Sequence, residues 1–150
     1  MRIRLLPGVE ALSGISLNSH NGKGRQREGL SRSVLVVDDE PMARMLLRLI
    51  MVRAGFEVIE AEDGIEALRI VAAEQPDLVI LDVMMPGMDG FEVCEKLRRI
   101  QGAKDLPIIM LSARTDRRSI ERGLEVGANM YLTRPIKPEV LTRYVREVLE

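Results

Sequence analysis

Several residue types are scarce in this 150-residue chain, and each scarcity excludes a class of protein. There is no Trp, and there are two Phe, two Tyr, one Cys and one His. One cysteine cannot form a disulfide within a chain, which fits a reducing cytoplasm. Direct binding of nucleic acid usually needs a basic face with aromatic residues, so we do not expect it. No apolar run is long enough to span a membrane. We therefore expect a cytoplasmic protein that contacts neither nucleic acid nor membrane.

Charge is divided unevenly along the chain, although the net value is −1. Residues 1–32 carry six Lys or Arg and two Asp or Glu, whereas the remainder carries 16 basic and 21 acidic side chains. Residues 1–32 show no sustained period of two or 3.6, so we expect a disordered leader. Pro7, Gly8 and Glu10 interrupt its first apolar stretch too early for a signal peptide. His20 lies in this leader, so we expect no catalytic or metal role for it.

From residue 33 onward, short apolar runs alternate about five times with helical patterns. The first helix is expected to follow Pro41, and one of its faces carries the apolar side chains of Met42, Met45, Leu46, Leu49 and Ile50. Cys94 lies in a later helical pattern and is expected to pack as a small hydrophobic residue. The alternation predicts an α/β fold over residues 33–150, with a doubly wound, five-stranded parallel sheet and helices on both faces.

Three carboxylates stand where two of the apolar runs end. Asp38 and Asp39 follow the first run, and Asp82 follows the third. Because ligands of open α/β sheets bind at the carboxyl ends of the strands, we expect the three to form one small site. Two carboxylates about 4 Å apart repel by roughly 4 kcal/mol at an effective dielectric near 20, so three need a cation or a shared proton. We expect a hard divalent ion, namely Mg²⁺, with Mn²⁺ as the alternative.

Other polar groups follow the remaining strands. Ser112 ends the fourth run, Arg134 follows the fifth, and the Met84 backbone lies just past Asp82. Asp82 can act as a nucleophile, while the Ser112 hydroxyl and the Arg134 cation can each bind a phosphoryl oxygen. Strand-end aspartates also cap helices and start turns. That simpler interpretation suffices for one aspartate, but not for the whole set of positions.

Four segments in order carry a resemblance to a known family. They are residues 36–40 (VVDDE), 81–90 (LDVMMPGMDG), 111–113 (LSA) and 127–135 (GANMYLTRP). Over residues 33–150 the chain resembles the response-regulator receiver domain of two-component signalling, in its single-domain, chemotaxis-regulator-like form with a flavodoxin-like fold.

The resemblance implies roles for the acidic residues. Asp82 would accept a phosphoryl group from the phosphohistidine of a sensor histidine kinase or phosphotransfer protein. Asp38, Asp39, Asp82 and the backbone carbonyl of Met84 would bind Mg²⁺.

The resemblance also implies a switch. Ser112 and Arg134 would bind the phosphoryl group, and Tyr131 would turn inward with Ser112. The fourth helix, fifth strand and last helix would then form the output face for a target or dimer partner. The family has lysine where this chain has Arg134, which is longer and planar. Asn129 and Met130 replace the usual acidic residues, which we interpret as a change of surface charge.

The function expected is that of a stand-alone response regulator, because no output domain follows Glu150. It would catalyse only its own phosphorylation and dephosphorylation, and would not otherwise be an enzyme. The alternative is a pseudo-receiver, a phosphorylation-independent interaction module, which Arg134 favours. A phosphatase would need a general-acid aspartate where Met84 stands. A nucleotide-binding protein would need a glycine-rich loop in place of residues 38–41.

Overall fold

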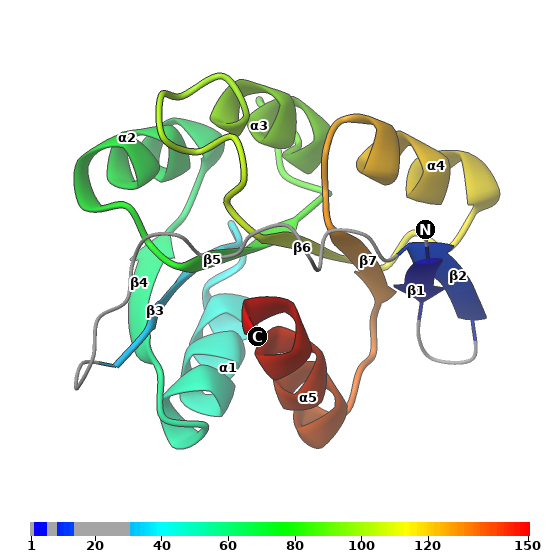
Figure 1. Ribbon diagram of the computed structural model, residues 1–150, viewed down its shortest axis with the longest axis horizontal. Helices are drawn as coiled ribbons and strands as arrows, with labels where there is room; N and C mark the ends of the chain where they lie inside the picture. Colours follow the sequence, from blue (N-terminus) through cyan, green and yellow to red (C-terminus); the bar gives the residue numbers. More distant parts are fainter. Residues whose placement is uncertain (1, 6–8, 14–30) are drawn as a thin grey trace.

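Within residues 31–150, five parallel strands form one sheet in the order β4-β3-β5-β6-β7 (Figure 1). The computed structural model describes residues 2–5, 9–13 and 31–150. The strands of this sheet are β3 (Ser33–Val37), β4 (Glu57–Ala61), β5 (Leu78–Asp82), β6 (Ile108–Ser112) and β7 (Met130–Thr133). The predicted doubly wound parallel sheet is confirmed.

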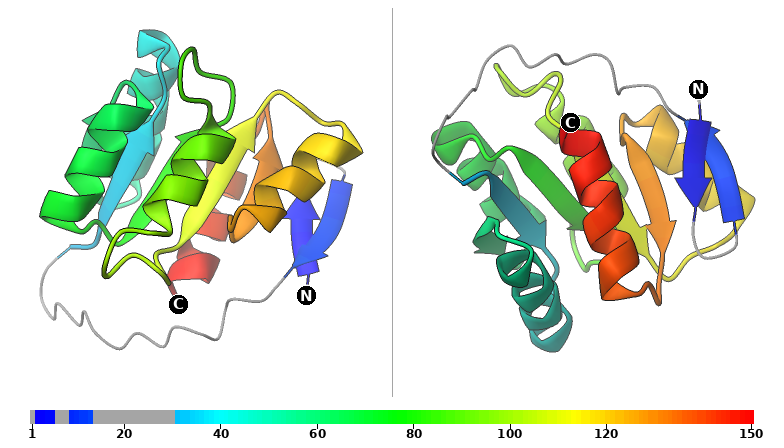
Figure 2. Two further views of the ribbon diagram at one scale, coloured as in Figure 1. Left: turned by 90° about the horizontal axis from the view of Figure 1, so that it is seen from above. Right: turned by 60° about the horizontal axis from the view of Figure 1, so that its bottom comes forward.

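Helices cover both faces of this sheet. They are α1 (Pro41–Arg53), α2 (Gly64–Glu74), α3 (Gly90–Leu97), α4 (Arg117–Glu125) and α5 (Pro138–Leu149). In Figures 1 and 2, α1 and α5 lie on one face, while α2, α3 and α4 lie on the other. None of the helices within the described ranges is long and apolar enough to cross a membrane. Because β3 has β4 on one side and β5 on the other, the strand order reverses between β3 and β5, and ligands of such folds bind at this point.

The core consists of two layers separated by the sheet. All five residues of β3 are buried, as are all five of β6, which is typical of central parallel strands covered on both faces. Successive side chains of a strand point to opposite faces. Leu35 and Val37 therefore pack with α2 and α3 residues, whereas Val34 and Val36 pack with α1 and α5 residues.

The orientation of α1 differs from the expected one. Leu47 and Met51 are its buried residues, and Ile50 is partly buried. The other predicted apolar side chains, with Val52, are 47–69% exposed. We call the exposed set the α1 stripe; it consists of Met42, Met45, Leu46, Leu49 and Val52. The helix is apolar on two faces, so periodicity alone could not tell which of them docks on the sheet.

Local signals set most helix ends. The Asp63, Asp89 and Asp116 side chains each accept a hydrogen bond from a backbone N–H of the helix that follows. The sequence after residue 97 is compatible with a helix as far as Gln101, but α3 ends at Leu97. Arg98 is its C-cap, and its guanidinium bonds to carbonyls of two loops.

A short antiparallel hairpin lies in the segment expected to be a disordered leader. Its strands are β1 (Arg2–Leu5) and β2 (Val9–Ser13), and β1 lies beside β7 (Figures 1 and 2). The structure differs from the expectation in these nine positions. The only local signal is the turn pair Pro7-Gly8 between two short stretches, since the second of them, residues 9–13, carries few β-branched or aromatic residues. The rest of the proposed leader through residue 30, including His20, lies outside the described residues.

Candidate functional site

The acidic residues at the ends of β3 and β5 lie together. Each of Asp38, Asp39 and Asp82 places one carboxylate oxygen within 4.8 Å of the others. The two strands are neighbours in the sheet, so their carboxyl ends lie side by side, as the sequence predicted. Gly90 packs behind β5, where an added Cβ would lie 2.7 Å from the Val83 Cα and closer still to the Asp82 carbonyl oxygen. The first residue of α3 must therefore be glycine for the helix to begin so close to the Asp82 backbone.

Asp38 is the most firmly held of the three carboxylates. It is 2% exposed, its Oδ1 accepts a hydrogen bond from the Glu40 N–H at 3.0 Å, and its Oδ2 lies 2.8 Å from Arg134 Nη2. The Asp38 carbonyl accepts a bond from Arg44 Nη1 at 2.8 Å, and Arg44 Nε pairs with Glu60 at 3.0 Å. Sequence reasoning missed Arg44 and Glu60 because their pairing depends on how α1 packs beside β4, which the spacing of the two residues does not indicate.

Asp82 has weaker partners. Its Oδ1 lies 3.4 Å from the Met84 backbone N–H and 3.9 Å from Arg134 Nη2. Burial, and after it the charges of Asp38 and Asp39, raise the pKa of the Asp82 carboxyl from 3.8 to about 6, against the lowering effects of Arg134 and the Met84 N–H. The single positive charge of the Arg134 guanidinium cannot offset the charges of three carboxylates. This surplus of oxygen ligands and negative charge fits a hard divalent cation such as Mg²⁺.

Most of the other predicted site residues lie at or near the carboxyl ends of β6 and β7, where they are hydrogen-bonded to the backbone. Ser112 is fully buried, and its Oγ accepts a hydrogen bond from the Arg114 N–H at 3.0 Å. The Arg134 N–H donates to the Ser112 carbonyl at 2.9 Å. Tyr131 is fully buried, and its hydroxyl donates to the Arg114 carbonyl at 2.9 Å. The Met84 side chain is half exposed, and its backbone N–H faces Asp82.

Tyr131 connects this region to α4. The Arg114 carbonyl that accepts its hydroxyl precedes the helix, and Gly123 of α4 packs against its ring. An added Cβ at Gly123 would lie 2.8 Å from a ring carbon. A movement of Ser112 or Arg114 would therefore reach α4 through the contacts of Tyr131 with Arg114 and Gly123.

Asn129 was interpreted as a surface change, and the structure corrects this. Its Oδ1 accepts hydrogen bonds from the Ile108 N–H at 2.8 Å and from Arg98 Nη2 at 3.0 Å. No local pattern around Asn129 indicates this network, because Arg98 reaches it from the end of α3. Cys94, about one helical turn into α3, is buried as expected, and burial raises the pKa of its thiol to about 11.

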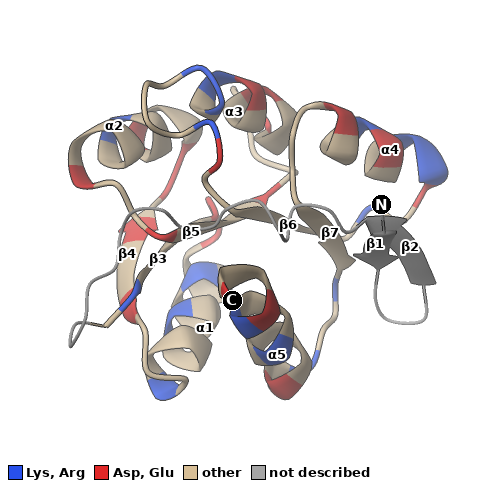
Figure 3. Ribbon diagram, in the orientation of Figure 1, with Lys and Arg blue, Asp and Glu red and all other residues tan. Residues whose placement is uncertain are grey.

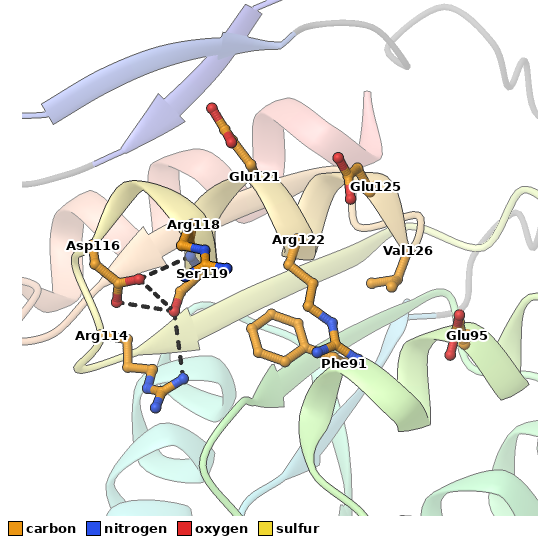
Figure 4. A pocket seen from close by; sticks show the side chains of 10 residues that line it. All are labelled: Phe91, Glu95, Arg114, Asp116, Arg118, Ser119, Glu121, Arg122, Glu125 and Val126. Carbon is orange, nitrogen blue, oxygen red and sulfur yellow. Dashed lines mark hydrogen bonds between the residues drawn. The ribbon is translucent and has the colours of Figure 1, made fainter.

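A groove of about 700 Å³ lies between α3 and α4 (Figure 4). Arg122 lies over the ring of Phe91 at 4.8 Å, and Arg114 points toward Ser119, which bonds to Asp116. The residues that line this groove do not include Asp38, Asp39 or Asp82. Basic and acidic side chains are mixed along the helices (Figure 3).

A doubly wound domain with clustered aspartates at the ends of β3 and β5, a serine after β6 and a cation after β7 has the architecture of a receiver domain. Residues 34–146 match the family model for the response regulator receiver domain, and the chain belongs to this family.

Curated relatives match about four fifths of the chain. It is 42% identical over 120 residues to the alkaline phosphatase synthesis transcriptional regulatory protein PhoP of Bacillus subtilis, covering 80% of this chain and 49% of that protein. It is 45% identical over 118 residues to the probable transcriptional regulator ycf27 of Cyanophora paradoxa, covering 79% and 48%. The chain thus spans about half the length of these relatives. Because they are named transcriptional regulators, they give no support to the expectations of a stand-alone protein and of no nucleic-acid contact.

Solved structures show the same fold. The chemotaxis protein CheY4 of Vibrio cholerae superposes with a TM-score of 0.76 at 36% identity, covering 79% of this chain and 99% of that one. The receiver domain of the sensor histidine kinase PA1611 of Pseudomonas aeruginosa has a TM-score of 0.75 at 27% identity, covering 80% and 98%. That structure has a magnesium ion coordinated in its active site cleft.

Proposed function

We propose that this receiver accepts a phosphoryl group on Asp82 in a Mg²⁺-dependent reaction and signals through protein contacts. The observation that carries the proposal is the cluster of three carboxylates within 4.8 Å at the ends of β3 and β5. The donor would be the phosphohistidine of a sensor histidine kinase or phosphotransfer protein. A carboxylate oxygen of Asp82 forms the new P–O bond as the P–N bond breaks, and the departing imidazole takes up a proton. The protein would catalyse only this step and the loss of its own phosphoryl group, in the cytoplasm.

Each site residue has a task in this reaction. Asp38, Asp39, Asp82 and the Met84 carbonyl would hold Mg²⁺, which when bound offsets negative charge on the phosphoryl oxygens. Ser112 would donate its hydroxyl hydrogen to one phosphoryl oxygen, and Arg134 would neutralise another.

The output follows from the contacts of Tyr131. When Ser112 turns toward the phosphoryl group, the hydrogen bond from the Arg114 N–H to Ser112 Oγ must change, and the Arg114 carbonyl holds Tyr131. We propose that this change reaches the face formed by α4, β7 and α5, where a downstream protein or a second copy binds.

The α1 stripe would bind the phosphoryl donor. Its five apolar side chains are exposed on one helix that begins two residues after Asp39, at the same edge of the sheet as Asp82. Exposed apolar patches of this kind mark protein contacts. A partner packed on the stripe would hold its phosphohistidine near Asp82.

We expect Leu46→Glu in the stripe to slow phosphotransfer at least tenfold. The donor would be the histidine kinase that phosphorylates the wild-type protein fastest in a panel. A charge in the apolar contact weakens docking. Phosphorylation by acetyl phosphate should stay within twofold. Ile65→Glu is the matched control, because Ile65 is 71% exposed but lies at the start of α2, on the other face of the sheet. Equal slowing by both variants would contradict the docking assignment.

Intact mass after incubation with acetyl phosphate and Mg²⁺ tests the phosphorylation itself. We expect a gain of one phosphoryl group that disappears in EDTA and in Asp82→Ala. The alternative, a pseudo-receiver, is favoured by the hold of Arg134 on Asp38. No mass gain from acetyl phosphate or from any kinase of the panel, with metal binding shown separately, would support that alternative.

A further inference from the structure

The Arg134 guanidinium contacts Asp38, a predicted metal ligand, and not Asp82, the predicted phosphoacceptor. Its Nη2 is 2.8 Å from Asp38 Oδ2 and 3.9 Å from Asp82 Oδ1. Asp38 is 2% exposed, so its carboxylate has little water to replace a lost partner. Its other oxygen already accepts the Glu40 N–H. Arg134 therefore contacts the Asp38 oxygen that does not accept the Glu40 N–H.

The anchoring of Arg134 allows its side chain to move while its backbone stays fixed. The Arg134 N–H bonds to the Ser112 carbonyl, so the end of β7 is tied to the end of β6. The Arg134 side chain is 28% exposed, in contrast to the buried Asp38 it contacts. Asp82 Oδ1 lies about 1 Å beyond contact distance of the same nitrogen. A small rotation of the side chain would therefore exchange Asp38 for a group on Asp82.

We propose that Arg134 and the divalent ion compete for Asp38 Oδ2, so that metal binding releases the guanidinium toward Asp82. The inference rests on the proposed metal site. Two cations cannot share one carboxylate oxygen at contact distance without strong repulsion. In the metal-free protein Arg134 offsets the charge of the buried carboxylate. Once the ion binds Asp38, Arg134 is free to bind a phosphoryl oxygen on Asp82. Arg134 is thus a positioning residue that lowers metal affinity and makes its own availability depend on the metal.

The first test compares Mn²⁺ affinities, measured by the EPR signal of the free ion. We expect Arg134→Gln to bind Mn²⁺ at least tenfold more tightly than the wild-type protein. Lys137→Gln is the matched control, because it removes the same charge from an exposed position three residues away, and we expect less than a twofold change. Equal affinities of wild type and Arg134→Gln would overturn the competition, although the metal site would stand. Failure of both proteins to bind Mn²⁺ would overturn the metal site and the inference together.

The second test uses the unaltered protein, so it does not depend on a variant folding. Side-chain ¹⁵N NMR should show the Arg134 guanidinium with hindered rotation in the metal-free protein, and Mg²⁺ at saturation should shift its signals and speed that rotation. Arg44 is the internal control, because it bonds to the Asp38 carbonyl and to Glu60 but not to the Asp38 carboxylate. Its signals should keep their hindered rotation. Unchanged Arg134 signals at saturating Mg²⁺ would overturn the proposal.

Discussion

Replacing Asp82 with asparagine is expected to stabilise the metal-free protein at pH 7.5 by about 1–2 kcal/mol. Burial and the Asp38 charge raise the pKa of Asp82 from 3.8 to about 6, so the folded state disfavours the ionised form. One pKa unit corresponds to about 1.4 kcal/mol, and partial exposure to solvent reduces the effect below the full shift. The amide occupies the same volume without the charge.

The pH dependence has a definite sign. Between pH 3.8 and 6 the folded protein binds a proton at Asp82 that the unfolded chain has lost, so wild-type stability falls as pH rises through this window. Below it, Asp82 is neutral in both states, and the advantage of Asp82→Asn should vanish. Urea unfolding at pH 3.5, 5 and 7.5 in EDTA measures this. Asp105→Asn, at an exposed carboxylate, is the control. A gain of equal size at all three pH values would contradict the charge argument.

Magnesium should reduce the stability advantage of Asp82→Asn. An ion that binds only the folded protein stabilises it by mass action, and Asp82→Asn removes one of its ligands. The difference between variant and wild type should therefore shrink as Mg²⁺ is added at pH 7.5.

The second large effect is expected at Arg98, far from the acidic cluster. Its guanidinium donates to the carbonyls of Ala103, Leu106 and Gly127 at 2.7–3.1 Å, and to Asn129 Oδ1 at 3.0 Å. Replacement by methionine keeps much of the apolar stem but leaves these oxygens without their donor. We expect a loss of about 2–4 kcal/mol in the free energy of unfolding.

Urea unfolding followed by circular dichroism measures the loss. Arg99→Met is the matched control, since the neighbouring arginine is exposed, and it should change stability by less than about 0.5 kcal/mol. If the two variants have the same stability, the hydrogen bonds of Arg98 contribute nothing net. Asn129→Asp keeps the accepting oxygen, so it should be far milder than Arg98→Met.

The strands and the acidic cluster could be predicted because their signals are local. A short, continuous run rich in β-branched residues, such as residues 34–37, is typical of a central parallel strand, and parallel strands bring their carboxyl ends to one edge. These two signals suffice to predict from the sequence that Asp38 and Asp82 are neighbours. The fifth run could be identified as a strand as well, because Asn129 and Arg134 bracket the short stretch of residues 130–133.

The features that sequence reasoning missed depend on contacts between distant segments. The α1 helix has two apolar faces, and only the packing against the sheet decides that Leu47 is inside and Leu46 outside. The reach of Arg134 to Asp38 depends on side-chain rotation, which no spacing encodes. Arg98 looked like an ordinary charge near the end of a helix, and its partners follow it by 5 to 31 residues.

The position of Arg98 has a mechanical consequence. The loops it joins lead into β6 and β7, so they lie at the edge of the sheet opposite the acidic cluster. Those two strands are therefore clamped where they begin, while their far ends carry Ser112 and Arg134. Displacements should therefore be larger at the ends of these strands than at their starts. If Ser112 and Arg134 move when Asp82 is phosphorylated, the starts of β6 and β7 should stay in place. The movement should instead be transmitted to α4 and to the face that α4 forms with β7 and α5.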